Sequence, residues 1–384
     1  MYNTFFVHTP VIFGCGSISI LAEKVKELGC KKVLVVCEKG VEDAGIIAKA
    51  TAILEAAGVG YAVFNGVVAD PPDSVVDQAG EFGLREGVDG IIGIGGGSSL
   101  DTAKAASILI TNPGPIRQYF VVPPLYVDTK TPVILVPTTA GTGSECTKVA
   151  IITLPDKNLK SPVDVNTSLA IVDPELMLTL PKSVTATTGL DALAHAMEAM
   201  TGINWNYHSD LFAVEAIKKI ARNLTVCCDE PGNLEARSEM ALAANWAGFA
   251  FNNPITHVGH GVADALACHF HTPHGQNCAL ALPETMALIG SVVPERMRTI
   301  ADAMCIPLGG HESGDELGKL VADAIRDLMR KVGIKSLKEM GYAREQVVSI
   351  YPDVLASFPS TFSPVKIDEE TAKKLLGAVY DTYQ

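Results

Sequence analysis

Apolar runs alternate with helix-forming stretches over the first half of the chain. The apolar runs are rich in β-branched residues and are KKVLVVCEKG (31–40), GYAVFNGVV (60–68), DGIIGIGGG (89–97) and PVILVPTT (132–139). The stretches between them that favour helices are 41–57, 74–87 and 99–110. Nearly continuous apolar strands separated by helices are typical of a parallel sheet covered on both faces. The first half therefore predicts an α/β domain.

The pattern changes near Pro181. From there on, strand-like runs almost vanish and alanine-rich amphipathic segments dominate, as in SEMALAANWAGFAF (238–251) and DELGKLVADAIRDLMRKVG (315–333). Apolar residues at helical spacing predict an all-α region. We expect an α/β domain over 1–180 and a helical domain over 181–384.

Composition argues against nucleic-acid and membrane partners. The 384 residues carry a formal net charge of −13, which argues against a nucleic-acid partner, because phosphate backbones select basic surfaces. No apolar run is long enough to span a bilayer, and the first residues lack the pattern of a signal peptide. The nine cysteines show no CxxC spacing. These features predict a soluble cytoplasmic protein with reduced thiols and no membrane partner.

A triple glycine marks a candidate phosphate site. GIGGGSSLDTAK (93–104) follows a strand and opens a helix, where the absence of Cβ atoms and the helix N-terminus suit a phosphate. It is not a P-loop, because Lys104 is misplaced for that motif, and it is not a Rossmann fingerprint, because position 98 is serine. The alternative is a tight turn between strand and helix with no ligand.

A second loop of small residues, PTTAGTGSE (137–145), also follows a strand. Its hydroxyls on Thr138, Thr139 and Thr142 could bind a diphosphate or a ribose. Two such loops favour a dinucleotide over a mononucleotide. Glu38, at the end of an earlier strand, would bind a ribose hydroxyl and repel a 2′-phosphate, which favours NAD over NADP. The alternative for Glu38 is a solvated loop acid.

Histidines and one aspartate suggest a metal site in the second half. TTGLDALAHAME (187–198) places Asp191 and His195 one helical turn apart on one face. HVGHGVADALACHFHTPHG (257–275) holds five of the nine histidines, and among them His260 and His274 could complete a set of one oxygen and three nitrogen ligands. Such a set suits Fe(II) or Zn(II). A hydrogen-bonded Asp–His pair without metal is the alternative.

Together these motifs resemble the iron-containing (group III) alcohol dehydrogenase family, and the resemblance covers essentially the whole chain. GGGSSLDTAK, PTTAGTGSE, TGLDALAHAME and the PHG at 273–275 match family motifs in order and spacing. The resemblance implies a dehydroquinate synthase-like fold, with an N-terminal dinucleotide-binding domain and a helical metal domain. It implies the metal ligands Asp191, His195, His260 and His274. It implies cofactor contacts from Glu38, Gly96, Gly97, Ser98, Asp101, Thr138, Thr139, Thr142 and Lys160.

One position departs from the family's pattern. The family usually has a second histidine four residues after the ligand that corresponds to His260, and here that residue is Asp264. His257 stands where the family often has a small residue. We predict that Asp264, His257 or both shape the substrate pocket and the proton path; the alternative is that Asp264 only holds a neighbouring side chain. His269 and His271 are expected to be solvated.

The expected activity is metal-dependent, NAD(H)-linked interconversion of a small primary alcohol and its aldehyde, with the metal polarising the substrate oxygen. Fe(II) is the expected metal and Zn(II) the alternative. Other readings are a glycerol or polyol dehydrogenase-like enzyme, a reductase of an aldehyde that bears an acidic group such as a sulfonate, a lyase that uses NAD transiently, and a non-catalytic NAD-binding regulator. The resemblance also implies a homodimer or a higher homo-oligomer.

Overall fold

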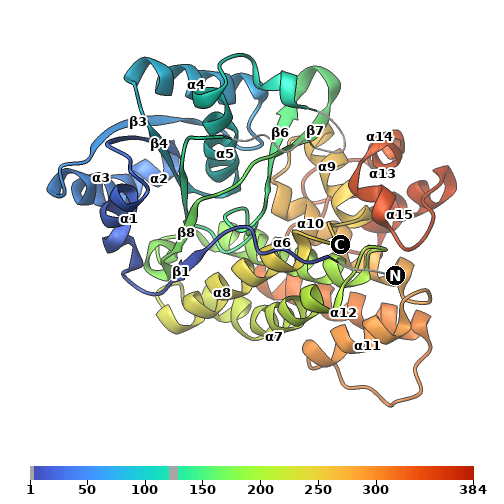
Figure 1. Cartoon of the computed structure of the whole chain (residues 1–384). Coiled ribbons are helices and arrows are strands. Elements are labelled where there is room, and N and C mark those ends of the chain that lie inside the picture. The colour runs from blue at the N-terminus through green and yellow to red at the C-terminus, as the bar shows by residue number, and fades with distance from the viewer. Residues whose placement is uncertain (1–3, 121–128) are drawn as a thin grey trace. The chain divides into compact units, whose positions relative to one another are not determined.

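The computed structural model describes residues 4–120 and 129–384, which fold into two compact units. The first unit contains Val7–Thr139 and Gly143–Thr179, and the second contains Leu180–Gln384 (Figure 1). Two short segments from the first half of the sequence, residues 4–6 and Ala140–Thr142, belong to the second unit.

A parallel six-stranded sheet forms the centre of the first unit, in the order β1-β8-β5-β4-β2-β3. Its strands are β1 (Val11–Phe13), β2 (Lys32–Glu38), β3 (Gly60–Val67), β4 (Gly90–Gly95), β5 (Val133–Pro137) and β8 (Leu169–Val172). Gly95 pairs with Pro137, so both small-residue loops begin at the same edge of the sheet. Ligands of parallel α/β sheets bind at this carboxyl edge.

Helices cover both faces of this sheet. Val33 and Val35 of β2 pack with α1 (Leu21–Glu27) and α3 (Ile46–Ala56) in one core. The alternate residues Leu34 and Val36 pack with α4 (Asp73–Glu86) and α5 (Gly97–Thr111) in another. Successive side chains of a strand point to opposite faces, so a strand buried on both sides is apolar throughout. The predicted α/β architecture is confirmed.

An antiparallel hairpin, β6 (Val149–Leu154) and β7 (Leu159–Asp164), forms a second small sheet that sequence patterning did not predict. Its buried residues pack on α5. The remaining helices of this unit are short: α2 (Lys39–Asp43) and the 3₁₀ turns η1 (Ser17–Ile20), η2 (Ile116–Tyr119), η3 (Pro155–Lys157) and η4 (Pro174–Met177).

The second unit is helical, and residues 180–384 contain no strand. Its long helices are α6 (Lys182–Thr201), α7 (Tyr207–Asp229), α8 (Leu234–Phe251), α9 (Val258–Phe270), α10 (His274–Ile289), α11 (Pro294–Ala303), α12 (Gly314–Val332) and α15 (Glu369–Asp381). Shorter ones are α13 (Arg344–Ser349), α14 (Tyr351–Ala356) and η5 (Pro359–Phe362). The buried helix α6 packs against α7, α8 and α10 (Figure 1). The predicted helical C-terminal part is confirmed.

Candidate active site

Helix α6 carries the first part of the candidate metal site. Asp191, His195 and Glu198 recur at intervals of four and three residues, which places them on one face of the helix. All three side chains are buried. Charged and polar groups buried in this way need partners, because burial without them costs several kcal/mol. The partners come from α9 and α10.

Two further histidines meet Asp191. His260 lies in the first turn of α9, and His274 is the first residue of α10. Asp191 Oδ1 lies 3.8 Å from His195 Nδ1, 3.8 Å from His260 Nε2 and 3.7 Å from His274 Nε2. Two ligand atoms that are each about 2.1 Å from one ion lie roughly 3.4 Å apart in a tetrahedral site, so each of these three distances is close to that expected for a pair of ligands of one ion.

Several atoms of this group lack hydrogen-bond partners, which indicates a cation-binding site. Asp191 Oδ1, His195 Nδ1 and His260 Nε2 are buried and have no hydrogen-bond partner. Native proteins seldom leave buried polar atoms unpartnered, and an absent ion is one explanation where several converge. Burial lowers the pKa of His195 to about 4, so its imidazole is neutral at physiological pH, as a metal ligand must be. The donor set of one oxygen and three nitrogens fits Fe(II) or Zn(II).

Glu198 holds His260 from the side opposite the metal group. Its Oε1 lies 2.8 Å from His260 Nδ1, and its Oε2 accepts the backbone N–H of His257 at 2.6 Å. A Cβ on Gly259 would lie 2.5 Å from Glu198 Oε1, so this close approach requires glycine. Burial alone would raise the pKa of Glu198, but His260 and His257 outweigh it and hold the pKa at about 2. A carboxylate on the outer nitrogen fixes the ring orientation of a metal-binding histidine.

Sequence reasoning gave Glu198 no role, although its spacing from Asp191 and His195 was a usable signal. We expect Glu198→Gln to weaken metal affinity by about 10- to 100-fold, because the outer partner of His260 loses its charge. Competition with a chelator measures this, and circular dichroism monitors the fold. Glu239→Gln, which changes a carboxylate paired with Lys219, is the control and should bind metal normally. Unchanged affinity in Glu198→Gln would contradict this role.

Cys278 also belongs to the metal-facing group. Ligand atoms of Asp191, His260, His274 and Cys278 all lie within 4.8 Å of one another. His195 is not in that compact set, although its Nδ1 faces Asp191. Burial, and after it Asp191, raise the pKa of the Cys278 thiol well above its usual range, so the thiol is protonated when no metal is present. Sequence reasoning did not single out this cysteine.

The two predicted proton-path residues have different surroundings. Asp264, on α9, is partly exposed, and its Oδ1 lies 3.7 Å from His274 Nδ1, the nitrogen that faces away from Asp191. His257 is fully buried, with Nε2 2.8 Å from Thr201 Oγ1 and Nδ1 3.6 Å from Glu198 Oε2. Burial lowers the pKa of His257.

The remaining histidines of the 257–275 stretch lie at the surface, as expected. His269 is exposed and pairs with Asp353 at 2.6 Å. His271 is exposed and ends α9 in the left-handed conformation, with φ of 52°. The five histidines therefore divide into two that face Asp191, one buried neighbour of Glu198 and two surface residues.

In the first unit, the glycine loop forms an open helix N-terminus. Gly96 is the N-cap of α5, and no side chain caps that helix. The free N–H groups and the helix dipole at such an end favour a phosphate. Glu38 Oε1 accepts the Gly96 N–H at 3.2 Å, so the carboxylate predicted to bind the ribose lies beside the predicted phosphate site. The Thr138 N–H donates to Gly95 O at 2.9 Å, which brings the threonine loop to the glycine loop.

Alanine at Gly96 and alanine at Gly95 should have opposite effects: the first should impair NADH binding, and the second should impair stability. A Cβ on Gly96 would meet no protein atom closer than 3.5 Å, and its backbone is in an ordinary extended conformation. We expect Gly96→Ala to fold normally and to weaken NADH binding about tenfold or more, because the methyl group would occupy space needed by the diphosphate and overpacking costs about 1–3 kcal/mol. A fluorescence titration with NADH measures this.

Gly95→Ala is the matched comparison. Its Cβ would lie 2.5 Å from Ser99 Oγ, and its φ is 152°, so this change should lower the melting temperature. A Gly96→Ala protein that binds NADH like the wild type would contradict the predicted phosphate site.

The other predicted cofactor residues differ in burial and in their contacts with the rest of the protein. The Asp101 carboxylate bonds Ser144, the Ile151 N–H and Lys104, so it anchors the 137–145 loop and β6 to α5. Lys160 pairs with Asp70 at 2.8 Å. Thr138 is buried and Thr139 is half-buried, whereas Thr142 belongs to the helical unit. Gly97 and Ser98 open α5.

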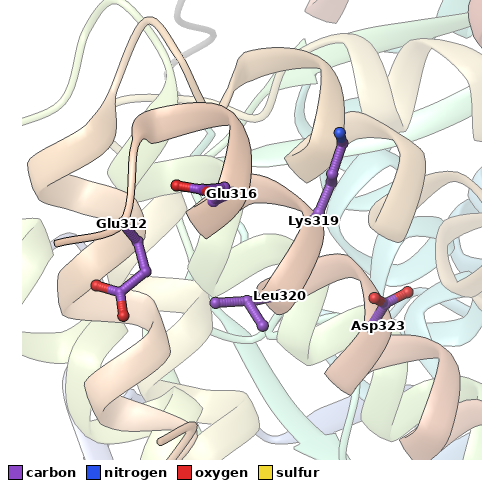
Figure 2. A pocket seen from close by; sticks show the side chains of 5 residues that line it. All are labelled: Glu312, Glu316, Lys319, Leu320 and Asp323. Atoms are coloured by element: carbon purple, nitrogen blue, oxygen red, sulfur yellow. The ribbon is translucent and has the colours of Figure 1, made fainter. Parts of the chain in front are cut away.

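A surface hollow on and before α12 is separate from these groups. Glu312, Glu316, Lys319, Leu320 and Asp323 line it (Figure 2). It is open to solvent, and two of its acids serve local structure: Glu316 forms the capping box of α12 with Ser313, and Glu312 accepts the Gly310 N–H. None of the predicted site residues lines it.

Comparison with known proteins identifies the chain. The family model described as iron-containing alcohol dehydrogenase matches residues 8–174, and the model of that family's C-terminal part matches residues 185–380. The chain belongs to the iron-containing alcohol dehydrogenase family. The resemblance drawn from the sequence motifs is confirmed. The family depends on NAD and iron, and the group around Asp191 offers a possible metal site.

Relatives of this family align over most of the chain. Long-chain-alcohol dehydrogenase 1 of Geobacillus thermodenitrificans is 34% identical over 361 residues, covering 89% of this chain and 87% of that protein. A crystal structure of 1,3-propanediol oxidoreductase matches with a TM-score of 0.93 and 32% identity, covering 99% of this chain and 100% of that one. Sulfoacetaldehyde reductase from Bifidobacterium kashiwanohense, in complex with NAD⁺, matches with a TM-score of 0.88 and 27% identity, covering 100% of each chain.

These matches confirm the predicted class of activity. The protein is an oxidoreductase of alcohols and aldehydes, and its reaction is NAD-linked interconversion of the two. Within residues 4–120 and 129–384, no helix is long and apolar enough to cross a membrane.

Proposed function

We propose that this dehydrogenase interconverts a small, uncharged primary alcohol and its aldehyde with NAD(H). The metal ligands are Asp191, His195, His260 and His274. The cofactor contacts come from Glu38, Gly96, Gly97, Ser98, Asp101, Thr138, Thr139, Thr142 and Lys160. The observation that carries the metal assignment is the convergence of buried atoms without partners on Asp191, His195 and His260.

The side chains of this chain prepare the reaction. When bound, the ion supplies Lewis acidity towards the substrate oxygen, and the dinucleotide supplies the hydride acceptor. Glu198 orients His260 through a hydrogen bond with Nδ1 of that histidine, and the Asp264 carboxylate lies 3.7 Å from Nδ1 of His274. Phe251 stacks on His195 with ring centroids 4.1 Å apart, which fixes that imidazole and excludes water from one of its faces.

Charge around the metal group favours an uncharged substrate. Asp191, Glu198 and Asp264 bring three carboxylates close to the ligand histidines, so a divalent ion bound by neutral imidazoles would still leave a net negative charge. An anionic group on the substrate would be repelled at short range in a poorly screened environment. This favours an alcohol or diol over an aldehyde that bears a sulfonate.

For the proton released by the alcohol, we propose Asp264 rather than His257. Asp264 is partly exposed and can exchange a proton with solvent, whereas His257 is fully buried and its Nε2 bonds Thr201. We expect Asp264→Asn to lower kcat about 100-fold and to remove one limb of the pH profile, because proton transfer contributes about that much. Asp264→His, which restores the family's usual residue, should recover both. Unchanged turnover and pH profile in Asp264→Asn would contradict this role.

A substrate panel tests the proposed function. Anaerobically purified protein would be assayed with NAD⁺ and NADP⁺ on primary alcohols, 1,3-diols and glycerol, and with NADH on lactaldehyde and sulfoacetaldehyde. Highest kcat/KM on an uncharged primary alcohol or diol, with NAD⁺ preferred, supports the proposal. Preference for glycerol would assign a polyol dehydrogenase instead. Preference for sulfoacetaldehyde would overturn the charge argument.

We further propose that the protein works in the cytoplasm as a homodimer or larger homo-oligomer. Tyr207 and Leu211, one turn apart on α7, are 73% and 71% exposed, and Ile203 precedes them. Exposed apolar groups of this kind are common at interfaces between copies. Light scattering of the purified protein distinguishes a monomer from an oligomer.

A further inference from the structure

Cys278 is a buried thiol that faces polar atoms. Its side chain is 1% exposed, and its Sγ lies 3.5 Å from Nε2 of His274. That same nitrogen lies 3.7 Å from Asp191 Oδ1. The sulfur therefore faces the point on which the predicted ligands converge.

The start of helix α10 fixes this position. Cys278 follows His274 by four residues, so both side chains lie on one face of the helix, as Asp191 and His195 do on α6. Asn277 donates from Nδ2 to the Ala263 and Thr272 carbonyls, both at 3.2 Å, which ties α10 to α9. A Cβ on Gly275 would lie 2.5 Å from Thr187 O, so α10 also packs directly on α6. The thiol is thus held in place by three helices.

Packing alone does not account for this cysteine. Other buried thiols in the same unit, such as Cys227, lie in helix α7 away from the metal-facing group. Beside Cys278, Asp191 Oδ1 and His260 Nε2 are buried and unpartnered. Thiolate sulfur is a strong ligand for borderline and soft divalent metals. An ion that satisfies those two atoms would be within reach of Sγ after a small side-chain adjustment.

We propose that the Cys278 sulfur is a further protein ligand of the same ion, in addition to the aspartate and the histidines. This inference rests on the proposed metal site. On binding, the thiol releases its proton to solvent and a sulfur–metal bond forms. Asp191 and Cys278 together then neutralise the charge of a divalent ion. The sulfur donor slows loss of the ion and shifts the preference of the site towards thiophilic metals such as Zn(II) and Co(II).

Cobalt substitution tests the proposal independently of turnover. The protein would be stripped with a chelator, loaded anaerobically with Co(II), and its absorption recorded. We expect a sulfur-to-cobalt charge-transfer band in the near ultraviolet for the wild type and for Cys227→Ser, which changes a buried thiol outside the group. Cys278→Ser should lose the band and release Co(II) to a competing chelator about tenfold faster or more, because neighbours of a metal centre contribute at least that much.

The possible outcomes distinguish failure of the proposed sulfur ligand from failure of the proposed metal site. A wild type that binds Co(II) with ligand-field bands only, and a Cys278→Ser protein that matches it in spectrum and release rate, would overturn the sulfur ligand and leave the proposed metal site intact. Failure of the wild type to bind Co(II), or normal binding by Asp191→Asn, would overturn the metal site and the sulfur ligand together. If Cys278→Ser does not fold by circular dichroism, Cys278→Ala takes its place.

Discussion

Asp191→Asn will lower kcat/KM on the order of 10³-fold, because loss of the anionic ligand removes about 4 kcal/mol of Lewis-acid stabilisation in the transition state. Asp191 Oδ1 is the atom around which the three histidine nitrogens gather at 3.7–3.8 Å. Asparagine keeps the shape of the side chain but not its charge. Metal content and steady-state kinetics of the purified variant measure the effect.

Without metal, Asp191→Asn should not lower the thermal stability of the protein, although it lowers the activity of the metal-loaded enzyme. In the metal-free wild type, Asp191 is a buried charge with an unpartnered oxygen, which is destabilising. After chelation, Asp191→Asn should therefore melt at the same temperature as the wild type or higher. Asp229→Asn, which changes an exposed carboxylate paired with Lys182, is the matched control for metal content and activity. A metal-free Asp191→Asn protein that melts well below the wild type would indicate a structural role instead.

Glu38→Ser will reverse much of the preference for NAD over NADP. We expect the ratio of kcat/KM for the two cofactors to fall on the order of 10³-fold: about 2 kcal/mol from lost hydrogen bonds to a charged group, and about 2 kcal/mol from lost repulsion of the 2′-phosphate. The position supports this, because Glu38 Oε1 already accepts the Gly96 N–H at the start of α5. Initial rates with NAD⁺ and NADP⁺ over a range of concentrations give the ratio.

Glu42→Gln is the control for the cofactor switch. Glu42 lies one turn further along, pairs with Lys39 and accepts a hydrogen bond from Asn65. Its replacement removes a nearby negative charge without touching the glycine loop, so the cofactor ratio should stay close to that of the wild type. Equal shifts in both variants would mean that general electrostatics, and not a ribose contact, determine the preference.

Sequence periodicity predicted four of the six strands of the parallel sheet and the helices between them. The runs at 31–40, 60–68, 89–97 and 132–139 each contain a strand of that sheet, because a strand buried on both faces must be apolar throughout. The edge strand β1, its neighbour β8 and the hairpin β6–β7 were not predicted. β1 spans three residues, and β6 alternates buried and exposed residues beside a turn that carries no glycine. A strand of three residues is too short to show a period, and a short apolar run such as Val149–Leu154 does not by itself distinguish a strand from a helix.

The residues of the candidate metal site could be predicted only in part from helical spacing. Helical spacing shows which residues share a face, so Asp191 and His195 stood out on α6. It does not show which face of another helix will meet them, so the contact of Glu198 with His260 and the proximity of Cys278 to Asp191 became visible only with the packing of α9 and α10. The spacing between His274 and Cys278 equals that between Asp191 and His195, and it was a signal that could have been used.

The most direct test is metal dependence. Metal content and NADH-linked turnover would be measured on anaerobically purified protein, after chelation, and after adding back Fe(II) or Zn(II). About one ion per chain, with activity lost on chelation and restored by the metal, is the predicted result. Full activity in protein shown to contain no metal would contradict the assignment of Asp191, His195, His260 and His274 as ligands of a catalytic ion.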